Sequence, residues 1–574
     1  MRMVDNKEIK KICEQRYGQM REYTLPWEAQ WRQLRDYIYP FIGRFEGEQE
    51  NKGERTDNEI LHGAAGLALR TLVSGFQSGI TSPSRPWLRL VLADTELSEF
   101  PRVREWLDRS RDVLLSHYRT SNFYGMTQSV YRECAVFGTA NTICNEDPKS
   151  VFRFRAMTCG EYMLDVDNTQ RLNCMARKFS DRAFNLVSMF GLDNLPLSVV
   201  DAYKNNDTKS KFEVRQLIFE NTFLDKNFFG WRGKPYISVY WMADSKTGSP
   251  GGSDSGILQV TGFDELPFAA PRWGVIGGDI YGKGSPGWEA LGDCKQLQQE
   301  VDSKLTQLDI LVRPPLNMPE GLRGGNVLPG GAITVPRDAE KGAWPMYQVT
   351  PQLNELRLDI NDVKMMIEET FFKPLFLAVI MGSDRQQTAR EVVEKHEEKL
   401  MMISPALDSM HNEFLSPLIT RDFNILMRRE LLPPPPDELL DSDIQVEYIG
   451  IFAQAQKMIE TQKTQETLMF ASSFAQFNPE ILDKINFDKA LDVYADGIGA
   501  SPGIVRDENE VAEIRQARAQ QQQAELERTQ AEQMAAQTLP RAAQGVKTLS
   551  EVDTSGAGNN ALMDVVNSLG GSIV

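Results

Sequence analysis

The chain has 574 residues, 41% hydrophobic and 9% aromatic, which is enough for two to four structural regions with sizeable cores. Its formal net charge is −17 and its isoelectric point is near 5.0. Duplex affinity comes mainly from Lys and Arg side chains that neutralise phosphates, so this charge argues against static or sequence-specific binding to nucleic acid. The negative charge does not exclude a surface along which nucleic acid moves without binding tightly.

Six cysteines and four histidines are too scattered to predict a metal site or a disulfide framework. No cysteines form a CxxC pair, and the segment from His396 to Leu400 lacks the second histidine of a zinc-protease helix. We expect reduced, buried thiols, no metal and no cofactor. The N-terminus has no signal-peptide pattern, and the Gly/Ala-rich run 60–80 contains Arg70 and Gln77, which favours a packed helix over a membrane span.

The first 120 residues predict helices, because apolar side chains recur every three to four residues. One helix is expected to begin around Thr24-Leu-Pro26, since a first turn tolerates proline, and to stop at Pro40. Two more are expected around 61–76 and 103–118. From residue 135 the pattern changes to strands.

Two features of the following region are typical of a sheet. Val151-Phe-Arg-Phe-Arg155 alternates apolar and basic residues. The β-rich runs 212–219 and 236–242 are separated by the turn-forming segment 227–233, which predicts a hairpin. Residues 1–287 are therefore expected to form a mixed α+β domain.

The most informative stretch runs from Trp288 to Phe372. Two segments with the apolar spacing of amphipathic helices flank a Gly/Pro-rich insert at 313–350. The chain is thus expected to go out along one helix, form a small head and return along the other. The apolar positions of such a rod would be buried against copies of the same chain. They are Leu291, Leu297, Val301, Leu305, Leu308 and Val312 on the first helix, and Leu353, Leu356, Ile360, Val363, Ile367 and Phe371 on the second.

After the rod, residues 373–387 are expected to form a short loop. A long helix follows from Thr388 to about Arg429, with kinks at Pro405 and Pro417. Alternation at 444–449 predicts a strand that returns to the mixed domain. Beyond it we expect helices over 452–497 and 507–537 and a weakly ordered tail from residue 540.

The segment Gly277–Ser285 resembles a P-loop without matching it. Lys283 has the right offset from the glycines, but Gly284 stands where a Ser or Thr must hold magnesium. The same glycines formally make a dinucleotide fingerprint, without a convincing βαβ unit. A glycine turn that leads into the helix at Trp288 is the preferred interpretation. No catalytic constellation is found, so we expect a protein that is not an enzyme; a nucleotide-dependent enzyme built on this loop is the alternative.

The order of these parts resembles the portal, or head-to-tail connector, proteins of short-tailed bacteriophages over about residues 7–530. The segments that carry the resemblance are Ser78-Gly-Ile-Thr-Ser-Pro-Ser-Arg-Pro-Trp87, Tyr281-Gly-Lys-Gly-Ser-Pro-Gly-Trp-Glu-Ala-Leu-Gly-Asp293, Thr388-Ala-Arg-Glu-Val392, Leu431-Leu-Pro-Pro-Pro-Pro436 and Ser501-Pro-Gly-Ile-Val-Arg-Asp-Glu-Asn-Glu-Val511.

The resemblance implies a mainly helical α+β subunit that assembles into a ring, usually of twelve copies. Its parts would be a wing (1–287), a first stem helix (288–312), a clip (313–350), a second stem helix (351–372), a tunnel loop (373–387), a kinked wing helix with a returning strand (388–452), a helical crown or barrel (453–540) and a flexible tail (541–574).

The resemblance also implies a function: a channel at one capsid vertex for genome packaging and ejection, located at the head-tail junction of the virion after assembly in the host bacterial cytoplasm. The implied partners are the terminase large subunit, a tail adaptor, the major capsid and scaffolding proteins, and double-stranded DNA that passes non-specifically, with no membrane. Another ring-forming tail or adaptor protein is the alternative. The candidate channel residues are Lys373, Asp384, Arg385, Gln386 and Gln387, and the candidate clip residues are Arg313, Arg323 and Asn326.

Overall fold

The computed structural model divides into two units, Met1–Gln456 and Lys457–Val574, which are considered separately. The described residues are 6–46, 60–92, 100–225, 228–242, 256–313, 316–317, 344–345, 353–381, 402–436, 439, 444–448, 468–469, 486–487, 489–491, 511–529, 553–555 and 559–560.

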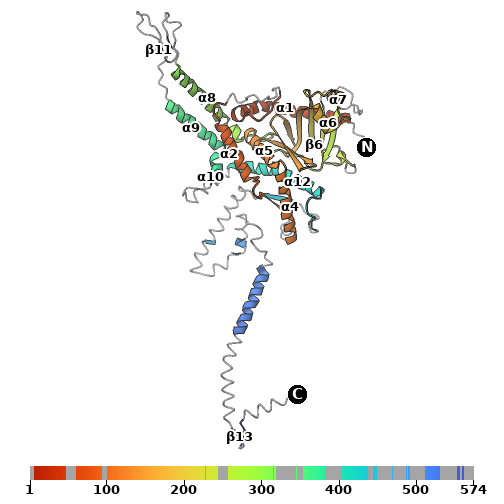
Figure 1. Cartoon of the computed structure of the whole chain (residues 1–574), viewed down its shortest axis with the longest axis vertical. Helices are drawn as coiled ribbons and strands as arrows, with labels where there is room; N and C mark the ends of the chain where they lie inside the picture. The colour runs from red at the N-terminus through yellow and green to blue at the C-terminus, as the bar shows by residue number, and fades with distance from the viewer. Residues whose placement is uncertain are drawn as a thin grey trace. The chain divides into compact units, whose positions relative to one another are not determined.

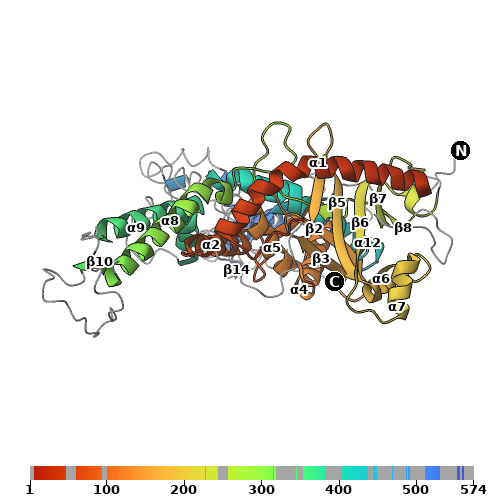
Figure 2. The ribbon, with the colours of Figure 1, turned by 90° about the horizontal axis from the view of Figure 1, so that it is seen from above.

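Helix α1 (Asn6–Ile38) opens the first unit and covers one face of the main sheet (Figures 1 and 2). It was predicted to begin near Thr24, but it starts eighteen residues earlier and runs through Pro26. Pro26 removes one backbone hydrogen bond, yet buried side chains continue on both sides of it, from Ile9 to Ile38. Burial of this long stripe outweighs the local cost of the proline.

The main sheet has five antiparallel strands in the order β4-β5-β6-β7-β8. The predicted hairpin is confirmed, because β6 and β7 pair from Arg215↔Trp241 to Glu220↔Tyr236. Helices α6 (Ala183–Phe190) and α7 (Leu197–Lys204) connect β5 to β6 and pack on the sheet through a separate small core. The strands are β4 (Tyr162–Val166), β5 (Leu172–Arg182), β6 (Lys211–Glu220), β7 (Tyr236–Trp241) and β8 (Ile257–Phe263).

Two smaller sheets join distant parts of the chain. In one, β2 (Asn141–Asp147) pairs with β3 (Val151–Met157) and with β9 (Phe268–Ala269). In the other, β1 (Leu88–Leu92) pairs with β12 (Ile444–Tyr448) in antiparallel register. The strand predicted at 444–449 is therefore confirmed, and it does return to the N-terminal part of the chain.

The largest core lies among helices α2 (Ala64–Gly79), α4 (Pro101–Thr120), α5 (Phe123–Phe137) and α12 (Ser416–Arg428). Its aromatic centre is a stack of Trp87, Tyr118 and Phe123, in which the last two ring centroids are 4.1 Å apart. Helix α2 is the run predicted to be a packed helix, and most of its residues are buried. Among the described residues no helix has both the length and the apolar character to span a membrane.

The predicted kinked helix departs from α geometry before Pro417. Residues 402–409 are α-helical, Met410–Leu415 form a π-helical turn (η3), and α12 follows with Pro417 in its first turn. Because proline cannot donate to the carbonyl four residues earlier, the wider π turn accommodates it. A kink was predicted at Pro417, and the structure has a change from α to π geometry directly before it.

Helices α8 (Pro286–Val312) and α9 (Leu353–Thr370) lie side by side and project beyond the sheet (Figures 1 and 2). Both predicted rod helices are thus helical. Of the insert between them the structure describes β10 (Leu316–Asn317) and β11 (Trp344–Pro345), which pair antiparallel and so bring its two ends together.

The loop predicted from residue 373 is wrong in its first part. Helix α10 (Lys373–Met381) begins directly after a break at Phe372. Pro374 suggested a loop, but a proline in a first helical turn costs no hydrogen bond, and Leu375 and Phe376 are buried. Residues 382–387 lie outside the described residues.

In the second unit, residues 511–529 form a helix within the predicted range 507–537. All of its residues are exposed except Val511, which is half-buried. The other described elements of this unit include the short strands β13 (Asp553–Ser555) and β14 (Asn559–Asn560), which pair with each other. None of the side chains of this helix is fully buried by the described residues.

Candidate functional site

The base of the α8–α9 rod is fixed on α5. Pro286 occupies the first turn of α8, where proline costs no hydrogen bond. The indole N–H of Trp288 donates to the carbonyl oxygen of Phe137 at 2.9 Å. Gly287 lies so close to Val136 that an added Cβ atom would be 2.4 Å from its carbonyl oxygen. Glycine permits this approach, so the direction of α8 is set within its first turn.

About three turns further along α8, Gln298 fixes this helix to the residues just before α2. Its side-chain carbonyl accepts the backbone N–H groups of Leu61 at 2.7 Å and His62 at 2.8 Å. Its amide nitrogen donates to the carbonyl of His62 at 3.0 Å. Three hydrogen bonds from one buried side chain make this a rigid junction.

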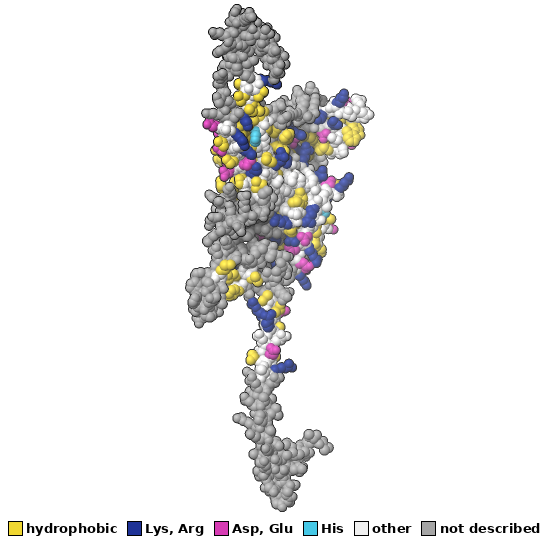
Figure 3. Space-filling view, turned by 60° about the vertical axis from the view of Figure 1, so that its left-hand side comes forward, with side chains coloured by type: hydrophobic (Ala, Val, Ile, Leu, Met, Phe, Trp, Pro, Cys, Tyr) yellow, Lys and Arg dark blue, Asp and Glu magenta, His cyan; other side chains and the backbone are white. Residues whose placement is uncertain are grey.

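Beyond Gln298 the rod carries a second set of apolar side chains that the described residues leave exposed. On α9, one face is buried at Ile360, Val363 and Ile367. Figure 3 shows hydrophobic side chains on the outer surface of the rod near the top of the view. Val312 is 75% exposed and Leu358 is 64% exposed. The exposed set is Leu305, Ile310, Leu311 and Val312 on α8 and Leu358, Met365 and Met366 on α9. Several large apolar side chains left exposed towards one end of a helix pair favour protein association there.

The joint between α9 and α10 is strained and braced. Phe372 has a φ angle of +53°, in the left-handed region that bulky residues avoid. Across the joint, the ammonium of Lys373 donates to the carboxylate of Glu368 at 2.7 Å. Phe376 fits against α2 at Gly75, where an added Cβ atom would lie 2.0 Å from the ring. These contacts hold α10 at a fixed angle to the rod.

Two of the eight predicted site residues fall within the described structure. Lys373 lies in α10 with its charge paired, as given above. Arg313 follows the last residue of α8, is exposed, and donates its backbone N–H to Asp309 at 2.7 Å. A cation there is favourable beside the negative end of the helix dipole. Asp384, Arg385, Gln386, Gln387, Arg323 and Asn326 lie outside the described residues.

The glycine-rich segment 277–285 is occupied by packing within the chain. A Cβ atom on Gly282 would lie 2.3 Å from the carbonyl oxygen of Gly138, and the N–H of Gly282 donates to the hydroxyl of Thr139 at 2.8 Å. The ammonium of Lys283 pairs with Asp279 at 2.7 Å. Two of the groups a P-loop needs for phosphates, a backbone N–H and the lysine, are therefore already engaged.

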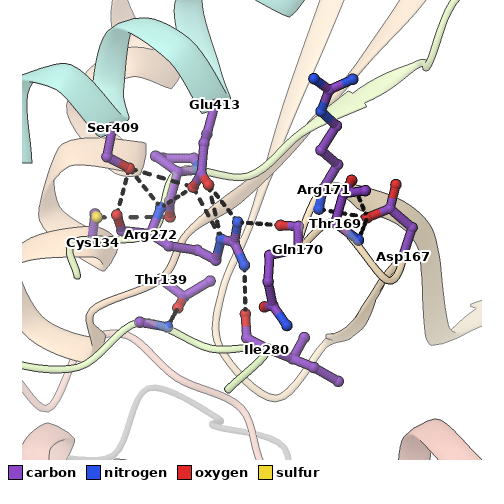
Figure 4. A network of polar contacts seen from close by, with 12 residues as sticks. Cys134, Thr139, Asp167, Thr169, Gln170, Arg171, Arg272, Ile280, Ser409 and Glu413 are labelled. Atoms are coloured by element: carbon purple, nitrogen blue, oxygen red, sulfur yellow. Dashed lines mark hydrogen bonds and ion pairs between the residues drawn. The ribbon is translucent and has the colours of Figure 1, made fainter. Parts of the chain in front are cut away.

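A buried arginine joins three distant segments at the π-helical turn. The Arg272 side chain is 4% exposed and pairs with the Glu413 carboxylate, which also accepts the backbone N–H of Arg272 at 3.0 Å (Figure 4). The same guanidinium donates to the carbonyl of Gln170 at 2.9 Å, in the β4–β5 turn. The Ser409 hydroxyl donates to the carbonyl of Arg272. The network ties the β4–β5 turn to Glu413 inside the π turn and to Ser409 directly before it.

Asp422 of α12 is fully buried without a cation of its own at hydrogen-bond distance in the described structure. Its carboxylate accepts the hydroxyl of Tyr118 at 2.9 Å and the thiol of Cys144 at 3.0 Å. Burial raises the pKa of Asp422 from 3.8 to about 7, although both donors and the charge of Arg421 oppose the rise. The carboxyl therefore keeps its proton to a much higher pH than an exposed aspartate does.

A family model described as "Bacteriophage head to tail connecting protein" matches residues 10–505. The chain belongs to this family.

Two relatives extend the match to nearly the whole chain. The "Probable portal protein" of Bordetella phage BPP-1 is 36% identical over 568 residues, which cover 98% of this chain and 99% of the relative. The "Portal protein" of Salmonella phage epsilon15 is 34% identical over 559 residues, 96% of this chain and 97% of the relative. A solved chain from the virion of a native gene transfer agent particle covers 69% of this chain and 89% of its own length, at 13% identity and a TM-score of 0.27, too low to bear on the fold.

Family membership decides between the functions that the sequence left open. The chain is a phage portal, or head-to-tail connector, and the nucleotide-dependent enzyme on Gly277–Ser285 is not supported. The family is structural rather than enzymatic, and phage portal proteins are components of the virion head. Within the described residues no group of His, Cys, Asp and Glu side chains could hold a metal ion.

Sequence reasoning missed the polar contacts that position the rod of this portal. Arg272 and Glu413 are 141 residues apart, and neither stands in a motif. Gln298 sits in a polar stretch of α8 that resembles any solvated helix face. Nothing in the local sequence distinguishes these residues, because their partners are set by the fold.

Proposed function

We propose that this chain assembles into a closed ring, with twelve copies as the expected number, and that DNA enters and leaves the head through its axis. The observation that carries the proposal is the exposed apolar face of α8 and α9. In a ring, rods stand side by side, so the exposed face of one rod would cover that of the next. Helices of this length are about 40 Å (α8) and 27 Å (α9) long, at 1.5 Å per residue, enough to line a channel wall.

The parts would have separate tasks in this ring. Residues 1–287, with the 388–452 helix and strand, would form the wing, and the rod (288–312 and 351–372) would form the stem. The insert 313–350, with Arg313, Arg323 and Asn326, would be the clip, and 453–540 the crown, followed by the tail 541–574.

The channel wall would carry few fixed contacts to DNA. Twelve copies at −17 each would carry roughly −200, so phosphates would be repelled and the duplex could move without adhering. Since Lys373 is paired with Glu368, the polar residues proposed to touch DNA are Asp384, Arg385, Gln386 and Gln387, after α10. They would act as a tunnel loop that contacts the duplex transiently.

The clip is proposed to bind first the terminase large subunit and then the tail adaptor, and the wing and crown to meet the capsid and scaffolding proteins. The chain itself would perform no catalysis. The packing of residues 277–285 supports this, because the loop is filled by residues 136–139. Assembly would take place in the cytoplasm of the host.

Electron microscopy and mass photometry of the purified full chain test the ring. We expect closed rings with a central hole, and a mass near twelve copies of 64.9 kDa. A matched pair of variants tests the stem: Leu358→Asp on the exposed face should prevent rings, whereas Asn354→Asp, also exposed on α9, should not. Compact monomers or dimers of the wild-type chain at micromolar concentration would refute the proposal.

A further inference from the structure

The connection between β6 and β7 presents aromatic side chains to solvent. Phe229 is 98% exposed and Phe228 is 49% exposed, and Trp231 is half-buried beside them. We call Phe228, Phe229 and Trp231 the aromatic knob. An exposed phenyl group contributes nothing to the core of its own subunit and orders water around itself. Buried aromatic anchors, by contrast, supply much of the energy of protein interfaces.

The knob is held in place by an unusual loop. The side-chain amide of Asn221 donates to three loop carbonyls, with the shortest bond, 2.8 Å, to Lys234. Gly230 has φ +100° and ψ −154°, a conformation confined to glycine. Gly233 passes so close to Phe228 that an added Cβ atom would lie 2.2 Å from its carbonyl oxygen. The loop is therefore pre-organised, which lowers the entropy cost of binding.

A pocket of the same chain has the complementary chemistry. It lies between the start of α6 and the end of α7 and has a volume of about 270 Å³. A cavity of about 150 Å³ lined by apolar groups binds benzene, so a phenylalanine side chain fits. Phe184 and Tyr203 form a stacked wall with ring centroids 6.3 Å apart. The lining also includes Arg182, Asn185, Asp207 and Thr208.

Charge complements the aromatic fit. On the knob, the Arg232 guanidinium lies 5.1 Å from the centroids of both Phe228 and Trp231, so the knob carries a cation on its rings. At the pocket, Asp207 is half-buried, and hydrogen bonds donated by the Ser210 hydroxyl and the Lys209 N–H keep the pKa of its carboxyl low. An arriving knob would bring a cation to a carboxylate that stays ionised.

The two features lie at opposite ends of β6. The pocket lies before the first residue of β6 and the knob lies after its last residue, so a strand of ten residues, about 33 Å long, separates them. A subunit cannot fill its own pocket across a rigid sheet. Two different patches that fit each other on identical copies make a head-to-tail contact, and such contacts generate rings when the rotation closes.

We propose that the aromatic knob of one copy occupies the α6–α7 pocket of the next copy. This contact rests on the proposed ring and adds a second belt of contacts, on the wing, to the one along the stem. Nucleic acid fits the knob less well, because the chain has a net charge of −17, and an anionic lipid surface would repel the chain for the same reason.

Cysteine cross-linking of assembled rings tests the contact. All six native cysteines are free and buried, so the background is low. The variant Phe229→Cys/Thr208→Cys, treated with a short bismaleimide, should give a ladder of covalent oligomers on a denaturing gel. Each single variant, and the control Phe229→Cys/Ser303→Cys with its second thiol on α8, should stay monomeric on that gel.

The outcomes separate the contact from the ring. Rings that form normally but give no ladder would overturn the contact and leave the ring intact. Cross-linking of Phe229→Cys in purified virions to a different protein would also overturn it and would assign the knob to that partner. Failure of the wild-type chain to form rings would overturn the ring itself.

A truncation gives an independent readout. Phe229→Ala should shift ring assembly to at least tenfold higher protein concentration, because a buried aromatic anchor is lost at every contact. The matched control is Phe41→Ala, which removes another exposed phenyl ring, at 71% exposure, and should assemble like the wild type. Equal behaviour of the two variants would overturn the proposal.

Discussion

The notch at Gly75 predicts a strong coupling between α2 and α10. A methyl group at residue 75 would lie 2.0 Å from one ring atom of Phe376 and 2.5 and 2.6 Å from two others. Carbon atoms in contact are about 3.5–4 Å apart, so the ring must move by roughly 1.5 Å or more. Phe376 is fully buried, so the ring cannot move into solvent without losing its contacts with the core.

These distances set the expected free energies. Overpacking costs about 1–3 kcal/mol, and the gain in helix propensity from Gly to Ala returns a part, so Gly75→Ala should cost about 2 kcal/mol net. Phe376→Ala should cost about 4 kcal/mol, as for other buried phenylalanines. In the double variant the added methyl group no longer meets a ring, so it should cost only about 3 kcal/mol. The coupling energy between the two sites is then about −3 kcal/mol.

Hydrogen exchange of the α10 amides in the full chain measures the free energy of local opening for each variant. Gly66→Ala is the matched control in the same helix, because its added Cβ atom would approach nothing closer than 3.9 Å. It should be neutral or stabilising by about 0.5–1 kcal/mol. The reasoning fails if Gly75→Ala behaves like Gly66→Ala, or if the coupling energy is smaller than about 0.5 kcal/mol.

Four further predictions concern the other contacts. Because the pKa of Asp422 is raised, its contribution to stability is complete below about pH 4 and is lost as pH rises to about 7. The free energy of unfolding, measured with denaturant, should therefore fall by about 4 kcal/mol over this range, and Asp422→Asn should abolish that fall. Glu413→Ala should cost about 3–5 kcal/mol in the same assay, because Arg272 stays buried without its carboxylate. Gln298→Ala should lower the free energy of local opening at residues 61–62, measured by hydrogen exchange, by about 1–3 kcal/mol. Calorimetry should detect no nucleotide binding to the wild type and none to Lys283→Ala.

Matched variants control three of these measurements. Asp359→Asn and Glu369→Gln alter exposed carboxylates of α9 and should change neither the pH dependence nor the stability by more than about 0.5 kcal/mol. Gln296→Ala, on the exposed side of α8, should not alter exchange at residues 61–62. A pH profile of Asp422→Asn parallel to the wild type, or a Glu413→Ala variant as stable as Glu369→Gln, would contradict the corresponding argument.

Periodicity predicted those elements whose burial is regular. The rod helices and the strand at 444–448 follow directly from the spacing of their apolar residues, and the strand pairs with β1 as expected of a returning segment. Proline misled the reading in two places. Pro26 lies inside α1 and Pro374 lies in the first turn of α10, because tertiary burial in one case and helix position in the other decide what a proline does.

The contacts between distant segments that fix the site could not be predicted. A notch between Gly75 and Phe376 requires two helices that are 300 residues apart in sequence to meet at a known angle. The aromatic knob was anticipated as a turn, but its exposure depends on where Asn221 directs the loop. Sequence alone indicates which residues are apolar; which of them the fold leaves uncovered is a property of the packed structure.

The burial of all six cysteines has a consequence for the particle outside the cell. Thiols react with oxidants as thiolates, and burial holds the pKa of Cys13, Cys174 and Cys294 at about 12, with Cys134, Cys144 and Cys159 also well above the ordinary value. A virion component must persist in aerated surroundings until the particle meets a host. With all six thiols buried, the chain is protected from thiol oxidation and disulfide exchange during that passage.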